Sequence, residues 1–171
     1  MSKFDQMILE MRAKQLLKEM MCSCAKEMIA VGIPVQIDCV IGIDILSLKG
    51  TRACCYCKKV DNKDTFVIGI HKKFLKYIDN EEVLKNVKNS MYHELLHTCK
   101  DSQDHGSEWM KWSKVCDEKL HTHTRCHLEE KVYYQLTTKY IVYTCPNCGN
   151  EYWAVKKIED TSCELCGSNM I

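Results

Sequence analysis

The sequence predicts an α+β fold in two parts, a larger domain of helices with a small antiparallel sheet and a small β-structured appendage. Apolar residues recur at helical spacing in residues 5–31, 81–97 and 107–120. Apolar and polar residues alternate, as in strands, between the first two of these segments. Near the end of the chain, two Cys-x-x-Cys pairs lie close together. We expect domains at residues 1–139 and 140–171.

The first predicted helix, residues 5–31, carries two apolar stripes that do not share a face. The first stripe consists of Phe4, Met7, Ile8 and Met11. The second consists of Ala13, Leu16, Leu17, Met20 and Cys24. The first turns are therefore expected either to pack differently from the rest of the helix or to extend away from it.

Three strands are predicted between this helix and the next. Residues 35–45 alternate between apolar and polar side chains, and residues 52–59 and 65–71 are the other two strand segments. The run Asp61-Asn62-Lys63-Asp64 is typical of a hairpin turn, because Asn and Asp tolerate the backbone conformations that tight turns need.

The second helix, residues 81–97, has clear signals at its start. Asp79 or Asn80 can cap it, and Glu81 and Glu82 suit the positive end of the helix dipole. Its core face is predicted to consist of Leu84, Val87, Met91 and Leu95. The third helix, residues 107–120, places Trp109, Trp112 and Cys116 on one side.

The second helix also carries His93-Glu94-Leu95-Leu96-His97, an H-E-x-x-H pattern. Two imidazoles four residues apart lie on one helical face and can bind one zinc ion. Glu94 lies about 100° around the helix from His93, where its carboxylate can act as a general base toward water. This pattern predicts a catalytic zinc site.

A catalytic zinc usually has three protein ligands and one open position. His105, in a polar loop before Gly106, is the preferred third ligand because imidazole suits zinc. The competing candidates are the nearby carboxylates Asp101, Asp104 and Glu108. Asp104 is also a candidate for orienting His105.

The two Cys-x-x-Cys pairs predict a second, structural zinc ion. Cys145 and Cys148 precede Gly149, and Cys163 and Cys166 precede Gly167. Glycine permits the positive φ of a tight metal-binding knuckle. Four thiolates close the coordination sphere, so this zinc has no open position for chemistry. The sequence therefore predicts two zinc ions per chain.

His93-Glu94-x-x-His97 followed by His105-Gly106-x-x-Trp109 resembles the SprT-like (Spartan-type) zincin metalloproteases. The resemblance extends over roughly residues 13 to 166. It implies a zincin-like domain whose active-site helix carries the H-E-x-x-H motif, followed by a zinc ribbon. It also implies that His105 is the third zinc ligand and that Glu94 is catalytic. The expected activity is that of a zinc metalloendopeptidase acting on proteins bound or crosslinked to DNA, a role in DNA–protein crosslink repair.

We expect that the other Cys and His residues do not bind a metal ion. Alternation places Cys55 and Cys57 on the face opposite Cys54, which disfavours a third site there. A second group is interpreted as a polar connection; it consists of His121, His123, Cys126 and His127. The first residues lack the apolar core of a signal peptide, and no apolar run is long enough to span a membrane. We therefore expect a cytoplasmic protein with reduced cysteines.

The net charge of +1 gives no independent support for nucleic-acid binding. Partnership with single-stranded DNA or with DNA–protein complexes therefore depends on the resemblance alone. The alternative interpretation is a non-proteolytic module whose ribbon docks on nucleic acid or protein. That ribbon would use the aromatic and basic residues Lys139, Tyr140, Tyr143, Tyr152, Trp153, Lys156 and Lys157. Glu94 favours the enzyme, because a docking module needs no general base beside its metal.

Overall fold

The computed structural model describes residues 2–47, 53–125, 141–149, 151–154, 157, 162–163 and 166–169. The chain divides into two compact units, unit 1 (Met1–His127) and unit 2 (Leu128–Ile171). The predicted boundary between residues 139 and 140 lies outside the described residues.

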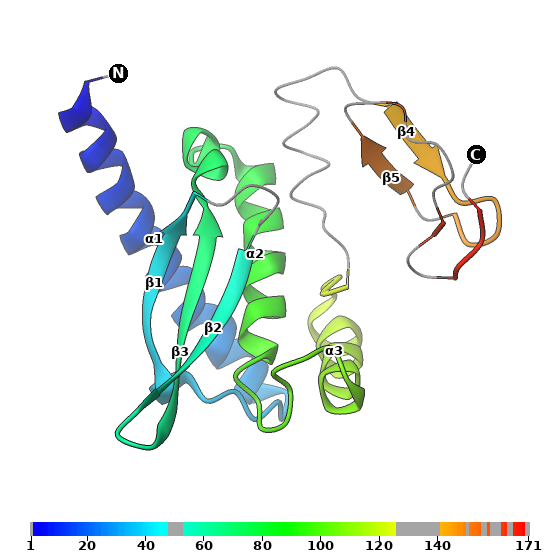
Figure 1. Cartoon of the computed structure of the whole chain (residues 1–171), viewed down its shortest axis with the longest axis horizontal. Coiled ribbons are helices and arrows are strands. Elements are labelled where there is room, and N and C mark those ends of the chain that lie inside the picture. The colour runs from blue at the N-terminus through cyan, green and yellow to red at the C-terminus, as the bar shows by residue number, and fades with distance from the viewer. Residues whose placement is uncertain are drawn as a thin grey trace. The chain divides into compact units, whose positions relative to one another are not determined.

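Unit 1 combines three α-helices with a three-stranded sheet, and unit 2 contains a two-stranded antiparallel sheet (Figure 1). The α+β class is therefore confirmed. In chain order the elements are α1 (Lys3–Ala30), η1 (Ile37–Cys39), β1 (Val40–Leu46), β2 (Ala53–Val60), β3 (Lys63–His71), η2 (Lys72–Tyr77), α2 (Glu81–Leu96), α3 (Ser107–Leu120), β4 (Ile141–Thr144) and β5 (Glu151–Ala154).

The sheet of unit 1 is mixed, so the prediction of an antiparallel sheet is wrong for one of its two strand pairs. The strand order is β1-β3-β2; β2 pairs antiparallel with β3, whereas β1 pairs parallel with it. The central strand, β3, buries Phe66, Ile68 and Ile70. The alternation of side chains identifies the face that each strand buries, but it does not identify the neighbour of each strand.

Helices α1 and α2 cover one face of this sheet (Figure 1). The α1 helix packs on β1, α2 packs on β2, and the two helices pack on each other. On β1, Ile45 pairs with Ile70 and packs against the cluster formed by Ala13 and Ile78. The apolar face of the sheet thus holds α2, the helix that carries the H-E-x-x-H motif.

The first turns of α1 extend past the end of the sheet (Figure 1). The helix begins with a capping box, in which Ser2 Oγ accepts from the Asp5 N–H and Asp5 accepts from the Ser2 N–H. Phe4 and Met11 are 64% and 66% exposed, whereas Ala13 is buried. The predicted change of apolar face is therefore real, and it coincides with the place where the helix meets the sheet.

The segment before β1 differs from the predicted strand at residues 35–45. The strand begins only at Val40, and Ile37–Cys39 form a 3-10 helix. The Gln36 N–H donates to Thr98 Oγ1 just beyond the end of α2, at 3.2 Å. Val35 is buried. This stretch is therefore bonded to the end of α2, and its 3-10 helix also contacts β3.

No helix among the described residues is both long enough and apolar enough to cross a membrane.

Candidate metal centres

The H-E-x-x-H motif lies at the C-terminal end of α2. The Asn80 side chain caps the start of this helix by accepting from the Val83 N–H at 3.0 Å, as one of the two predicted alternatives requires. His93 lies in the last turn, and His97 is the C-terminal cap with backbone angles that are still close to helical. The two imidazoles therefore keep the spacing of neighbouring turns.

The loop between α2 and α3 brings His105 to the same place. The ring centroid of His105 lies 5.0 Å from that of His93 and 4.9 Å from that of His97. One ring nitrogen from each histidine can be chosen so that all three lie within 4.8 Å of one another. Nε2 of His93 and Nε2 of His105 are 3.1 Å apart.

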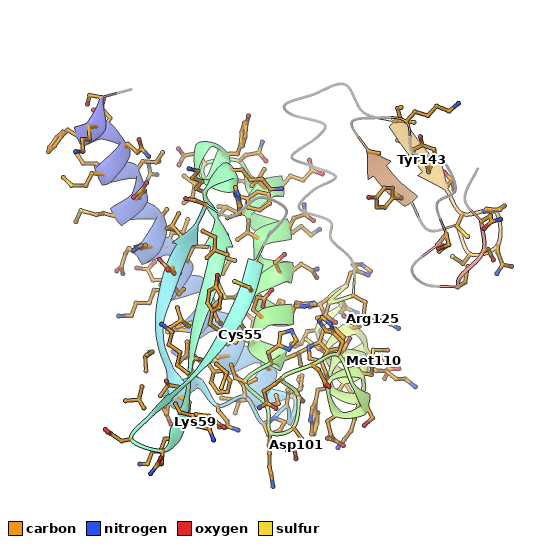
Figure 2. The ribbon with its side chains drawn as sticks, in the orientation of Figure 1. Cys55, Lys59, Asp101, Met110, Arg125 and Tyr143 are labelled. Atoms are coloured by element: carbon orange, nitrogen blue, oxygen red, sulfur yellow. The ribbon has the colours of Figure 1, made fainter. Side chains whose placement is uncertain are left out.

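None of the competing carboxylates joins this group, as far as the described residues show. Asp101 lies in the loop between α2 and α3, where it adopts a positive φ of 58° and is exposed (Figure 2). Asp104 accepts a hydrogen bond from the Gly106 N–H at 3.0 Å, just before α3 begins. It therefore caps the turn into α3. Among the described residues, no hydrogen bond joins Asp104 to His105, so the predicted orienting role of Asp104 has no support here.

Two backbone carbonyl groups fix the protonation of the helix histidines. Nδ1 of His93 lies 2.7 Å from the Thr124 carbonyl oxygen, and Nδ1 of His97 lies 2.9 Å from that of Ser102. A carbonyl oxygen only accepts, so in each ring the proton is assigned to Nδ1. The neutral rings therefore present unprotonated Nε2 atoms, whose lone pairs are the donors that a metal ion requires.

Burial favours the neutral form of His97. Removal from water lowers the pKa of His97, against the opposing effect of its bond to the Ser102 carbonyl, and the neighbouring His105 lowers it further. A neutral imidazole is the form that binds metals. The electrostatics and the hydrogen bonds thus prepare the same ring nitrogen for coordination.

Trp109 forms an aromatic wall beside the three histidines. Its ring centroid lies 4.5 Å from that of His105, 4.9 Å from that of His93 and 5.8 Å from that of His97. Trp109 is 2% exposed and is on α3, one residue after Glu108. Its packing limits the freedom of all three rings.

Glu94 is buried on α2, at 5% exposure, and α2 packs against β2. Burial raises the pKa of the Cys55 thiol to about 12, and the negative charge of Glu94 contributes to that shift. Cys55 lies on β2, which packs against α2 (Figure 2). Burial and the charge of Glu94 therefore together keep the thiol of Cys55, on this edge strand of the sheet, protonated.

Unit 2 contains a second group of side chains that could hold a metal ion. The four sulfur atoms lie within 4.8 Å of one another, and they belong to Cys145, Cys148, Cys163 and Cys166. The Cys145–Cys166 and Cys148–Cys163 sulfur pairs are both 3.5 Å apart, too far for a disulfide. Tetrahedral zinc with Zn–S bonds of 2.3 Å separates sulfurs by roughly 3.8 Å, so the spacing suits four-thiolate coordination.

The two knuckles of this group have the same backbone form. Gly149 and Gly167 both have φ of 72°, as the sequence predicts for tight knuckles. Their N–H groups donate to the carbonyls of Cys145 and Cys163 at 2.9 and 2.8 Å. Hydrogen bonds with Ser168 lower the pKa of the Cys166 thiol to about 5, and the bond with the side chain has a larger effect than the bond with the backbone. The lowered pKa favours the thiolate, which is the form that binds a metal.

The other Cys and His residues weighed from the sequence form no further group. Within the described part of the chain, neither the Cys54–Cys57 stretch nor His121 and His123 belongs to a metal-binding group. Cys126 and His127 lie outside the described residues.

Sequence reasoning did not identify Thr124 and Ser102 as partners of the histidines. Both act through backbone carbonyl groups, which every residue possesses, so no residue type marks them.

No protein-family model, curated protein or solved structure matches this chain. The two candidate sites are therefore the features of the chain that bear on its function.

Proposed function

We propose that the chain is a zinc-dependent metallopeptidase of the SprT-like type, with a zincin-like catalytic domain and a C-terminal zinc ribbon. The convergence of the ring nitrogens of His93, His97 and His105, two of them on the helix that also carries Glu94, supports this proposal. Three neutral imidazoles are a common donor set of catalytic zinc sites, and they leave a fourth position open.

The residues fit a zinc ion. Zn–N bonds of 2.0–2.1 Å in a tetrahedral arrangement place two nitrogens roughly 3.3 Å apart. The Nε2 atoms of His93 and His105 are 3.1 Å apart, and the assigned tautomers of His93 and His97 expose Nε2. Imidazole suits several transition metals, but the absence of thiolate and carboxylate from the described group favours zinc over softer or harder ions.

Zinc at this position would polarise the scissile carbonyl and acidify water. Glu94 would receive the proton of the attacking water and pass it to the leaving amine nitrogen. Hydrogen bonds to the Thr124 and Ser102 carbonyls would keep the rings of His93 and His97 oriented, with Nε2 as the coordinating atom of each.

The position of β2 favours a peptide as the substrate. This strand is at the edge of the sheet, and it packs against the helix that carries Glu94. An edge strand offers backbone N–H and C=O groups with which an extended peptide can pair. Such pairing selects an extended backbone and leaves side-chain specificity low, so substrate choice would depend on recruitment.

We assign recruitment to unit 2 and propose proteins bound or crosslinked to DNA as the substrates. This part of the proposal rests on the resemblance described above. Tyr143 is only 9% exposed, so its ring belongs to the core of unit 2 and is not free to stack on a base. That burial gives no support to the alternative, a docking module without proteolytic activity.

The test of the proposed chemistry is the substitution Glu94→Gln. The amide cannot accept a proton from water, so peptide hydrolysis should fall by about 100-fold or more. Zinc content should stay at the parent value, because Glu94 is not one of the three proposed ligands. Cleavage of a flexible protein substrate and metal analysis of the same preparations provide the two measurements.

His97→Ala is the matched control, because it removes a proposed ligand and leaves Glu94 in place. It should lose both activity and the zinc of the three-histidine site. Undiminished hydrolysis by a folded Glu94→Gln variant would refute the proposed mechanism. A parent protein that binds zinc but cleaves no protein, with or without single-stranded DNA, would favour the docking module.

A further inference from the structure

The turn that follows α3, residues 121–125, is hydrogen-bonded to two helices. We call it the post-α3 turn. His121 ends α3 in the left-handed conformation, with φ of 54°, and so reverses the chain. Thr122 is 8% exposed and Thr124 is 1% exposed, a degree of burial that is unusual for a polar turn. Buried polar groups are normally hydrogen-bonded, so the polar groups of this turn are expected to have partners.

Asp117 on α3 supplies several of these partners. Its Oδ1 accepts from the Thr124 N–H at 2.8 Å, from the Thr124 hydroxyl at 3.0 Å and from the Thr122 hydroxyl at 2.8 Å. The Thr124 hydroxyl also lies 2.7 Å from the Ser113 hydroxyl. Arg125, beside α3 in Figure 2, lies 3.8 Å from the second carboxylate oxygen of Asp117.

Asn89 on α2 holds the same turn from the other side. Its Oδ1 accepts from the His123 N–H at 2.8 Å, and its Nδ2 donates to the His123 carbonyl at 2.8 Å. The side-chain amide therefore forms two bonds to the backbone of one residue, as a neighbouring strand would. Asn89 is on the same helix as His93, one turn earlier.

The result of this bonding is the position of the Thr124 carbonyl. It lies 2.7 Å from Nδ1 of His93, which is 31 residues away in sequence. The equivalent partner of His97, the Ser102 carbonyl, is only five residues away. The orientation of His97 is therefore set locally, whereas that of His93 depends on the docking of the post-α3 turn.

We propose that Asn89 and Asp117 are positioning residues for the metal centre, which fix the ring of His93 through the backbone carbonyl of Thr124. This inference rests on the proposed function only in that the three histidines bind zinc. Neither residue touches the metal or the substrate. Their contribution is to hold one carbonyl where it keeps the proton on Nδ1 and the lone pair of Nε2 directed to the other two histidines.

The effect should be confined to metal affinity and to one histidine. Loss of the partner of a metal-binding histidine typically weakens metal binding by about 10- to 100-fold. Without the Thr124 carbonyl, His93 can take either tautomer and rotate, while His97 keeps its bond to Ser102. The two rings should therefore respond differently to the same substitution.

The experiment uses the full chain with the four-cysteine site loaded and measures zinc affinity by competition with a chromophoric chelator. Asn89→Ala and Asp117→Ala should each weaken zinc binding to the three-histidine site by about 10- to 100-fold. Asp117→Asn keeps an oxygen that can accept from Thr124, so it should restore most of the affinity. Glu27→Gln is the control, because Glu27 binds α2 through Lys88 and Tyr92 without contacting His93.

A second readout is the side-chain ¹H–¹⁵N spectrum of the histidines. In the parent, His93 and His97 should both carry the proton on Nδ1. In folded Asn89→Ala, the His93 signals should move away from that tautomer, while the His97 signals should keep their positions. A role in stability alone would not separate the two rings.

Zinc affinity within twofold of the parent in folded Asn89→Ala and Asp117→Ala would overturn the inference and leave the proposed function intact. If both variants fail to fold, the spectrum of the parent still tests the inference. A proton on Nε2 of His93 in the parent would overturn the inference. A parent that binds no zinc at the three histidines would remove the proposed function and this inference together.

Discussion

Glu27 forms polar contacts that join α1 to α2, the helix of the candidate metal centre. Its carboxylate accepts from Lys88 Nζ at 2.9 and 3.1 Å, from the Ser23 hydroxyl at 3.0 Å and from the Tyr92 hydroxyl. Burial alone would raise the pKa of Glu27, but the bonds from Tyr92, Lys88 and Ser23 outweigh burial and lower it. A depressed pKa means that the ionised form stabilises the fold.

Glu27→Gln should therefore lower the free energy of unfolding by about 0.5–1 kcal/mol at pH 7, a small value because the side chain is about one-third exposed. The stabilisation is complete above the ordinary glutamate pKa of 4.5 and is lost as the pH falls through the lowered pKa of the folded state. Urea unfolding of parent and variant at several pH values measures the difference. A difference that grows below pH 4.5 would contradict this assignment.

Single residues also show where prediction from sequence stops. His93, His97 and His105 could be named because imidazole has few roles at this spacing, and the structure brings all three together. Their orienting groups could not be named, because a backbone carbonyl leaves no trace in residue type. Asn89, two turns from the helix start, looks in sequence like any polar residue on an exposed face.

At the scale of elements, the β2–β3 hairpin shows how local chemistry sets a connection. Asp61 and Asn62 occupy the two central positions of the turn, with φ of 50° and 62°. Two consecutive positive φ values define the turn type whose twist matches that of the flanking strands, and Asn and Gly are its preferred residues. The flanking pair is Val60 and Lys63.

Substitutions at Asn62 should follow the cost of the left-handed conformation. Asn62→Ala should destabilise unit 1 by about 1 kcal/mol, since a Cβ without a local hydrogen-bonding group disfavours positive φ. Asn62→Gly should be neutral or slightly stabilising, because glycine adopts this conformation freely. Urea unfolding monitored by circular dichroism compares the three proteins. Equal stability of the Ala and Asn proteins would show that the turn has another form in solution.

The extent of each helix followed from periodicity and capping, and residues 107–120 are helical as predicted. The pairing of the strands could not be predicted from the sequence in this way. Alternation correctly places Cys55 and Cys57 opposite Cys54, but it holds equally for a strand with a parallel or an antiparallel neighbour. The parallel pairing of β1 with β3 is a tertiary choice, made when the strand that buries the most side chains takes the centre of the sheet.

At the scale of the whole molecule, two donor sets of different chemistry predict two zinc ions of unequal lability. Four thiolate ligands would leave no open position on a zinc ion, whereas three histidine ligands would leave one through which a chelator can attack. A chelator should therefore remove the zinc of the three histidines first. Metal analysis at successive times after chelation should show two phases of one equivalent each.

Cys148→Ala provides the matched control, since it removes one ligand of unit 2 and leaves unit 1 unchanged. It should abolish or accelerate the slow phase alone. A parent with a single tightly bound zinc would remove one of the two site assignments.

Two truncations separate the roles of the units. The residues that hold His93 end at Arg125, so a chain cut after residue 139 retains the complete post-α3 turn. It should fold, bind zinc at the three histidines and cleave a flexible peptide at the parental rate. Any stimulation of cleavage by single-stranded DNA should weaken, because unit 2 is assigned to recruitment.

A chain cut after residue 120 keeps every proposed ligand of unit 1 but lacks the Thr124 carbonyl. It should bind zinc at the three histidines about 10- to 100-fold more weakly than the longer truncation. Chelator competition on both proteins, with circular dichroism to verify folding, makes the comparison. Equal affinity would show that the ring of His93 needs no support from beyond α3.

If the cut after residue 139 retained full stimulation by DNA, recruitment would belong to unit 1.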